Sequence, residues 1–134
     1  MIDQLRMLEE FHTVFGAHME RTPTADLAEE TIALRVSLIQ EELDEYRQAA
    51  EGRDLVGIAD ALSDLMYVVL GTYVAHGLQD LAEPLFAEVH ASNMSKLDEN
   101  GRVIFRADGK VLKSALWRPP NLAGILERNA GAGS

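Results

Sequence analysis

The chain has 134 residues, of which 47% are hydrophobic and 25% charged, a composition that is ordinary for a soluble globular protein. Its 22 acidic and 12 basic side chains give a formal net charge of −10, which disfavours non-specific binding to nucleic acid or to an anionic membrane. The absence of cysteine excludes disulfides and thiolate metal sites. We expect a single domain over residues 1–130 and a disordered tail over residues 131–134.

Neither targeting nor membrane insertion is indicated by the sequence. Residues 1–6 lack the basic block and the apolar block of a signal peptide. The longest apolar run, over residues 65–75, is too short to span a bilayer. These features predict a cytoplasmic protein.

The first part of the chain is predicted to form three helices. Apolar residues at spacings of three and four predict a helix over residues 3–18 that ends near Gly16. A second helix is expected from residues 24–26 to about Ala50, and a third from Asp54 to about Ala75. The third helix is apolar over most of its circumference, as a central helix would be.

The second part of the chain changes character. A fourth helix is expected over residues 80–96, with Pro84 tolerated in its first turn. Two turn signals and an alternating apolar segment predict a hairpin-like loop over residues 98–117. A short last helix should run from Pro119 to about Arg128. The predicted fold is therefore all-α, with a four-helix bundle core, an irregular C-terminal loop and a short last helix.

Two acidic clusters stand inside the second and third predicted helices. They are Glu41-Glu42-Leu43-Asp44-Glu45 and Asp60-Ala61-Leu62-Ser63-Asp64. At about 100° per residue, Glu41, Glu42 and Glu45 share a sector with apolar residues and lie away from the solvated face. Asp60 and Asp64 lie one turn apart on the most apolar helix. Because buried carboxylates without a partner are costly, facing clusters of this kind predict a Mg²⁺ or Mn²⁺ site.

Plainer interpretations compete with this one. An acidic string on a helix is usually a solvated face, but Asp is a poor interior helix residue and seldom recurs on a buried helix. A single histidine on a partly apolar face is more often hydrogen-bonded than a metal ligand, and this applies to His12, His18, His76 and His90. Among these histidines, only Glu9-x-x-His12 matches the Glu-x-x-His element of ferritin-like di-iron bundles. Because such a bundle needs this element twice, a di-iron oxidase is disfavoured.

The acidic clusters also carry a family resemblance. Glu41-Glu42-x-x-Glu45, followed on the next helix by a cluster ending in Asp64 and by the run at residues 65–69, resembles the all-α nucleotide pyrophosphohydrolases. These include MazG-like proteins, phosphoribosyl-ATP pyrophosphohydrolases and dimeric dUTPases. The segments 86–96, 107–113 and 117–120 resemble the MazG-like branch that includes dUTP-hydrolysing members. The resemblance covers roughly residues 8 to 128.

This resemblance implies a helical homo-oligomer, usually a dimer, that cleaves a nucleoside triphosphate between its α and β phosphates. The products would be a monophosphate and pyrophosphate. The cofactor would be Mg²⁺, with Mn²⁺ as a substitute. By position, Glu42, Glu45 and Asp64 would be metal ligands. Glu41 would be a further ligand or, with the neighbouring Glu42, the catalytic base. The leading substrate candidate is dUTP, with other noncanonical nucleotides and deoxynucleotides left open.

The same resemblance implies a set of substrate-binding residues. Asn93 and Lys96 would contact the nucleotide, while Lys110 and Lys113 would supply positive charge to the triphosphate. A solvated loop is the alternative for the lysines, and a helix C-cap is the alternative for Asn93. The functional interpretation is favoured for the lysines because they concentrate in one segment of a chain otherwise poor in positive charge.

One position departs from the family pattern. The usual second motif is Glu-x-x-Asp, but the residue three places before Asp64 is Ala61, and the nearest acid is Asp60. Either Asp60 substitutes as a ligand, or the site has fewer ligands. The departure mildly favours a second hypothesis, a non-catalytic dimeric helical module that binds a nucleotide. A third hypothesis, an interaction protein without a small ligand, predicts no metal binding.

Overall fold

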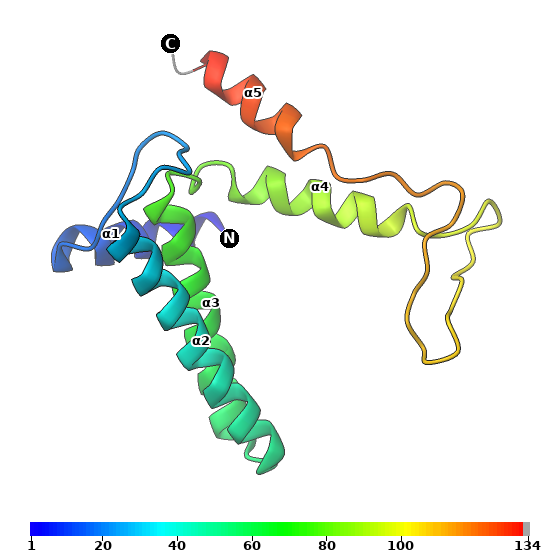
Figure 1. The fold of residues 1–134 in the computed structure, drawn as a ribbon, viewed down its shortest axis with the longest axis horizontal. Coiled ribbons are helices and arrows are strands. Elements are labelled where there is room, and N and C mark those ends of the chain that lie inside the picture. Colours follow the sequence, from blue (N-terminus) through cyan, green and yellow to red (C-terminus); the bar gives the residue numbers. More distant parts are fainter. Residues whose placement is uncertain (133–134) are drawn as a thin grey trace. The chain divides into compact units, whose positions relative to one another are not determined.

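The computed structural model describes residues 1–132, and five helices account for most of them (Figure 1). The helices are α1 (Ile2–Phe15), α2 (Glu29–Glu51), α3 (Leu55–Ala75), α4 (Ala82–Met94) and α5 (Leu122–Ala132). The strand-like pairing in the described part of the chain is one isolated antiparallel bridge, between Phe105 and Val111. The predicted all-α class is confirmed.

The chain divides into two compact units, which are described separately. The first unit, Met1–Asp80, holds α1, α2 and α3, and the second, Leu81–Ser134, holds α4 and α5. The expected single domain over residues 1–130 stays a prediction. Helix α5 extends through Ala132, so it takes in the first two residues of the expected tail over 131–134. The remaining two residues of that tail lie outside the described residues.

Hydrogen bonds explain where helix α1 ends and where α2 begins. Gly16 closes α1 with a φ of 71°, and its N–H donates to the carbonyl of His12. Helix α2 begins at Glu29, later than the predicted start at residues 24–26. The reason is that Thr24 is tied to His76: its N–H donates to the His76 carbonyl at 2.9 Å, and its own carbonyl lies 2.8 Å from His76 Nδ1. This pairing keeps the backbone of residue 24 out of the helix.

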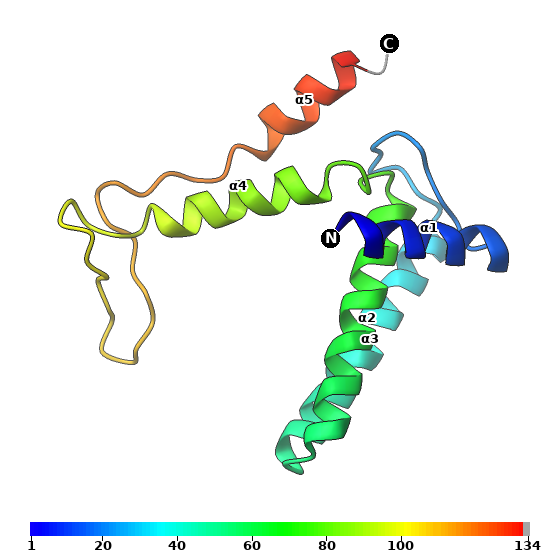
Figure 2. The same ribbon diagram turned by 180° about the vertical axis from the view of Figure 1, so that it is seen from behind.

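Helices α2 and α3 form an antiparallel hairpin and lie side by side in both views (Figures 1 and 2). The turn between them places Arg53 at a φ of 54° and starts α3 with an N-cap, in which the Gly57 N–H donates to the Asp54 carboxylate at 3.1 Å. Helix α1 packs against α3, where Leu5 and Leu8 are almost fully buried. The hairpin is therefore the scaffold on which both acidic clusters are carried.

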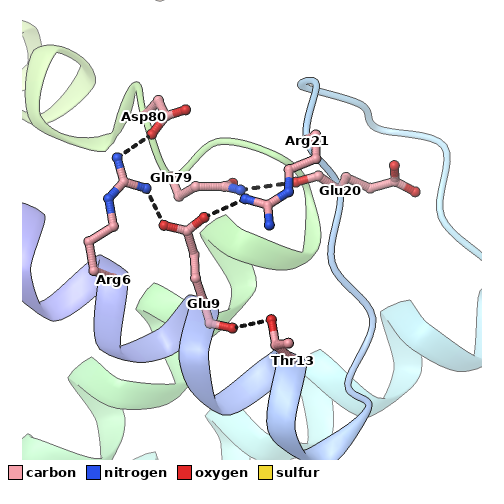
Figure 3. A network of polar contacts seen from close by, with 7 residues as sticks. All are labelled: Arg6, Glu9, Thr13, Glu20, Arg21, Gln79 and Asp80. Atoms are coloured by element: carbon pink, nitrogen blue, oxygen red, sulfur yellow. Dashed lines mark hydrogen bonds and ion pairs between the residues drawn. The ribbon is translucent and has the colours of Figure 1, made fainter.

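Figure 3 shows the polar network that ties α1 to the loop after it and to the loop after α3; its residues are Arg6, Glu9, Thr13, Glu20, Arg21, Gln79 and Asp80. The Glu9 carboxylate pairs with Arg6 and, at 2.7 Å, with Arg21. Arg6 also bonds Asp80 at 2.8 Å, and the buried Gln79 amide donates to the Glu20 carbonyl at 3.0 Å. Exposed pairs contribute little singly, but here they converge on one carboxylate. The Glu9 carboxylate is thus engaged by two guanidinium groups.

The second unit is organised around the start of α5. Helix α5 begins at Leu122, after the predicted Pro119, because the Asn121 side chain accepts the Gly124 N–H at 3.0 Å and so caps the helix. Buried Ser92 on α4 donates to the Arg118 carbonyl at 2.7 Å. Between α4 and α5, residues 98–117 form the expected hairpin-like loop, with backbone bonds on both sides of the Phe105–Val111 bridge.

Helix α3 is unusually apolar for a helix that carries two aspartates. By length and hydropathy alone, Leu55–Ala75 is long enough to cross a membrane, although the apolar run at residues 65–75 within it is not. Central helices of soluble proteins share this property. Its apolar surface is only partly covered within the chain, since Leu55, Val56 and Met66 are exposed.

Candidate metal centre

Three carboxylates from the two acidic clusters meet across the α2–α3 hairpin. Glu42 and Glu45 stand one turn apart on α2, and Asp64 faces them from α3. Each offers a carboxylate oxygen, and the three oxygens lie within 4.8 Å of one another. Helical spacing explains the pair on α2, because residues three apart share a face. The antiparallel packing of α3 brings the third carboxylate to that face.

The electrostatics of this cluster favour a bound cation. Within the described part of the chain, Oε2 of Glu42 is buried and has no hydrogen-bond partner. Burial, followed by the nearby carboxylates of Glu45, Asp64 and Glu41, raises the pKa of Glu42 above its ordinary value. Three hard oxygen donors with one unpaired buried oxygen suit Mg²⁺ or Mn²⁺, which prefer carboxylate ligands. The residues present therefore fit a divalent cation.

Two other predicted ligands lie outside this group. Asp60 and Glu41 are both exposed, and neither belongs to the three-carboxylate cluster. Glu41 acts on the cluster through its charge, which contributes to the raised pKa of Glu42. Ala61, one turn before Asp64, is 2% exposed. The cluster thus draws two carboxylates from α2 and one from α3.

The predicted substrate-binding residues all lie in the second unit. Asn93 is exposed in the last turn of α4, and its carbonyl accepts the Lys96 N–H at 3.2 Å, as expected for a helix C-terminus. Lys110 and Lys113 are exposed in the hairpin-like loop. Nζ of Lys113 lies 4.0 Å from the centroid of the Trp117 ring, a cation–π contact that holds this lysine on the loop.

One residue near the cluster was missed by reasoning from the sequence. Arg35 on α2 is 9% exposed, and its guanidinium bonds neutral groups of α3. The signal available was its position seven residues before Glu42, which places both side chains on one face of the helix. A single arginine on an amphipathic helix is normally assigned to solvent, so this signal carried little weight.

Comparison with known proteins places the chain in a family. Residues 8–93 match the family of phosphoribosyl-ATP pyrophosphohydrolases. The chain belongs to this family. The matched region includes all three clustered carboxylates and Asn93, whereas the three lysines lie beyond it.

A solved structure agrees with this assignment. The crystal structure of a candidate NTP pyrophosphohydrolase from Exiguobacterium sp. 255-15 is similar over 98% of this chain and 98% of its own, with 26% sequence identity and a TM-score of 0.57. No curated protein matches the chain. The family and the structural match support a pyrophosphohydrolase of the all-α type, and they leave the MazG-like and dUTPase branch as a prediction.

Proposed function

We propose that this pyrophosphohydrolase hydrolyses a nucleoside triphosphate, in a reaction that depends on a divalent cation, to a nucleoside monophosphate and pyrophosphate. The observation that carries the proposal is the group of three carboxylates across the α2–α3 hairpin, with its buried and unpaired Glu42 oxygen. This group lies inside the region that matches the pyrophosphohydrolase family. A housecleaning role in the nucleotide pool would follow from such an activity.

In this proposal the carboxylates hold the cation and the rest of the chain handles the substrate. Glu42, Glu45 and Asp64 would bind Mg²⁺, or Mn²⁺ in its place. When bound, the cation would offset the charge of the triphosphate and lower the pKa of an attacking water. Glu41, exposed next to Glu42 on α2, is the proposed base that would take a proton from that water, and Glu42, with its raised pKa, is the other candidate for this role.

The substrate class is proposed from charge and from the family. All three lysines of the chain lie between residues 96 and 113, so positive charge for the phosphates would come from Lys96, Lys110 and Lys113, with Asn93 beside them in sequence. We propose dUTP as the first candidate, and phosphoribosyl-ATP belongs in the same test because the matched family is named after it.

A second copy of the chain is the proposed macromolecular partner, and we expect neither nucleic acid polymers nor membranes as partners. A groove of about 260 Å³ between α1 and α3 is lined mainly by apolar residues, among them Met7, Leu62 and Met66. Exposed apolar surface of this kind favours self-association to a dimer or a dimer of dimers. We propose a cytoplasmic location, in keeping with a role on free nucleotides.

The deciding experiment measures pyrophosphate release from a panel of nucleotides. The panel contains dUTP, the other deoxynucleoside and ribonucleoside triphosphates and phosphoribosyl-ATP, each with Mg²⁺, with Mn²⁺ and with EDTA. We expect pyrophosphate and the monophosphate from at least one substrate, and no product in EDTA. Nucleotide binding without release on any substrate would instead support the non-catalytic binding module.

A further inference from the structure

Arg35 is a buried cation that has no acidic partner among the described residues. Its Nε donates to Thr72 Oγ1 at 3.0 Å, and its Nη2 donates to the Val68 carbonyl at 2.8 Å. Both acceptors are neutral and both belong to α3. Arg35 is buried, and because charge is costly in such a place, burial lowers its pKa. Arg35 therefore joins α2 to α3 through two hydrogen bonds to neutral acceptors.

The neighbouring backbone is shaped around this guanidinium. A Cβ added at Gly71 would lie 2.6 Å from Nη2 of Arg35 and 3.1 Å from Nε2 of the buried His12. A Cβ at 2.6 Å would force the guanidinium to shift, so glycine at residue 71 leaves the space that the Arg35 side chain now occupies. Three helices therefore meet at one point: α2 supplies Arg35, α3 supplies Gly71 and α1 supplies His12.

The contact of Arg35 with α3 and the carboxylate cluster are separated by the same number of turns on α2 and on α3. Glu42 lies seven residues after Arg35 on α2, and Asp64 lies eight residues before Thr72 on α3. Two turns, or about 10 Å of helix, separate the two levels of the hairpin. Because α2 and α3 run antiparallel, fixing Arg35 against Val68 and Thr72 also fixes which residue of α3 faces Glu42.

We infer that Arg35 is a positioning residue for the metal centre: its two hydrogen bonds to α3 set the register of the α2–α3 hairpin, which places Glu42 and Glu45 opposite Asp64. This inference rests on the proposed function for the identity of the bound group. Carboxylates that must converge on one cation tolerate little displacement, because a cation site depends on ligand geometry. A longitudinal slip of α2 would separate the oxygens that now lie within 4.8 Å.

The sign of the effect separates positioning from simple charge. Removing a positive charge near three carboxylates should strengthen cation binding if charge alone acts. If Arg35 sets the register, Arg35→Met should weaken cation binding.

Arg47→Met is the matched control, because Arg47 lies on the same helix, is exposed, and has the same charge to lose. Binding of Mn²⁺ to the metal-free chain is measured by electron paramagnetic resonance, without substrate. We expect about tenfold weaker binding in Arg35→Met and equal or tighter binding in Arg47→Met.

A second arm measures the register itself. The chain has no cysteine, so nitroxide labels can be placed at Ser37→Cys and Ala59→Cys, on exposed positions of α2 and α3. We expect one narrow distance distribution with Arg35 and a shifted or broadened one with Arg35→Met. Thr72→Val keeps the charge and removes one bond, so it should act in the same direction more weakly. Circular dichroism confirms that each variant is folded before it is measured.

Two results would overturn the inference: an unchanged distance distribution in Arg35→Met, or Mn²⁺ binding in that variant as tight as in the wild type or tighter. Failure of the wild type to take up Mn²⁺ would instead remove the proposed metal centre. In that case the distance arm still decides whether Arg35 sets the register. The two failures are therefore distinguishable.

Discussion

The two units of this protein differ sharply in charge. Residues 1–80 carry 16 acidic and 5 basic side chains, whereas residues 81–134 carry 6 acidic and 7 basic ones, including every lysine. The first unit holds the three-carboxylate cluster, and the second holds the residues proposed to bind phosphates. A polyanionic substrate would be repelled by the first unit unless a cation is bound there, whereas acidic and basic side chains nearly balance in the second unit, so that repulsion is absent. In the proposed function, the first unit would bind the cation and the second would bind the phosphates.

The largest expected effect comes from removing a clustered carboxylate. Glu42→Gln, Glu45→Gln or Asp64→Asn should lower turnover by about two orders of magnitude or more, because each removes a proposed ligand of the cation. Turnover is measured on the substrate found in the nucleotide panel at saturating Mg²⁺. Asp44→Asn is the control, since Asp44 is exposed on the same helix and bonds Gln40.

The same variants carry a stability signature. Removing one of several like charges should leave the metal-free chain equally stable or more stable, and Mg²⁺ should raise the melting temperature of the wild type more than that of the variant. Variants that turn over within a few fold of the wild type would contradict the assignment of these residues as ligands.

The next largest effect tests the basic half. Lys110→Gln combined with Lys113→Gln should raise KM about tenfold and change kcat little, because these lysines are proposed to bind the triphosphate and not the reacting water. Mn²⁺ binding to the free protein should not change. Arg128→Gln, which removes one exposed charge from α5, is the control. An unchanged KM would assign the lysines to a solvated loop.

A smaller effect is expected at the position that departs from the family pattern. Asp60 is exposed and lies outside the carboxylate cluster, so Asp60→Asn should alter turnover by about twofold at most. Activity is followed across a Mg²⁺ titration beside Asp64→Asn. A loss of about two orders of magnitude in Asp60→Asn would show that Asp60 does replace the acid missing at Ala61.

The contrast between Asp60 and Asp64 shows what helical periodicity can predict. The sequence placed both aspartates one turn apart on an apolar helix, and it placed Glu41 in the same sector as Glu42 and Glu45. It predicted the all-α class and the helices that carry the acids. The sequence could not show which acidic side chains converge. A helix face that spans about 100° includes residues that point at the neighbouring helix and residues at the margin of that contact. That choice depends on the rotation and register of α2 against α3.

Helix boundaries and buried polar contacts that depend on residues far apart in the chain could not be predicted from the sequence either. The late start of α2 depends on the pairing of Thr24 with His76, which are 52 residues apart. The role of Arg35 depends on acceptors on α3 more than thirty residues away and on the space left by Gly71. Contacts of this range leave no local pattern. Local signals such as the Asp54 cap and the Gly16 terminus were predictable because both partners lie within one turn.

The two units should also respond differently to acid. In the first unit, burial lowers the pKa of His12 below its ordinary value of 6.5. The hydrogen bond with the His18 carbonyl raises this pKa by a smaller amount, and the nearby charges of Arg35 and His18 lower it slightly. Below pH 6.5 His12 of the unfolded chain binds a proton, whereas His12 of the folded chain stays neutral. The contribution of His12 to stability is therefore fully present above pH 6.5 and is lost as the pH drops from 6.5 towards the lower folded pKa. His12→Asn keeps a donor for the His18 carbonyl, which lies 2.8 Å from Nδ1, and should flatten this slope in melting temperature.

The smallest expected effect lies in the second unit, at lower pH. The N–H of Asn121 and then the Arg118 guanidinium hold the pKa of Glu88 below its ordinary value of 4.5. A carboxylate with a depressed pKa stabilises the fold above pH 4.5, and this contribution disappears as the pH falls through the lower folded value. Glu88→Gln should therefore flatten the melting profile below pH 4.5 and leave the slope near pH 6 as in the wild type. If Glu88→Gln changes the melting temperature profile near pH 6, or leaves it unchanged below pH 4.5, then the two units do not differ in their response to acid as expected.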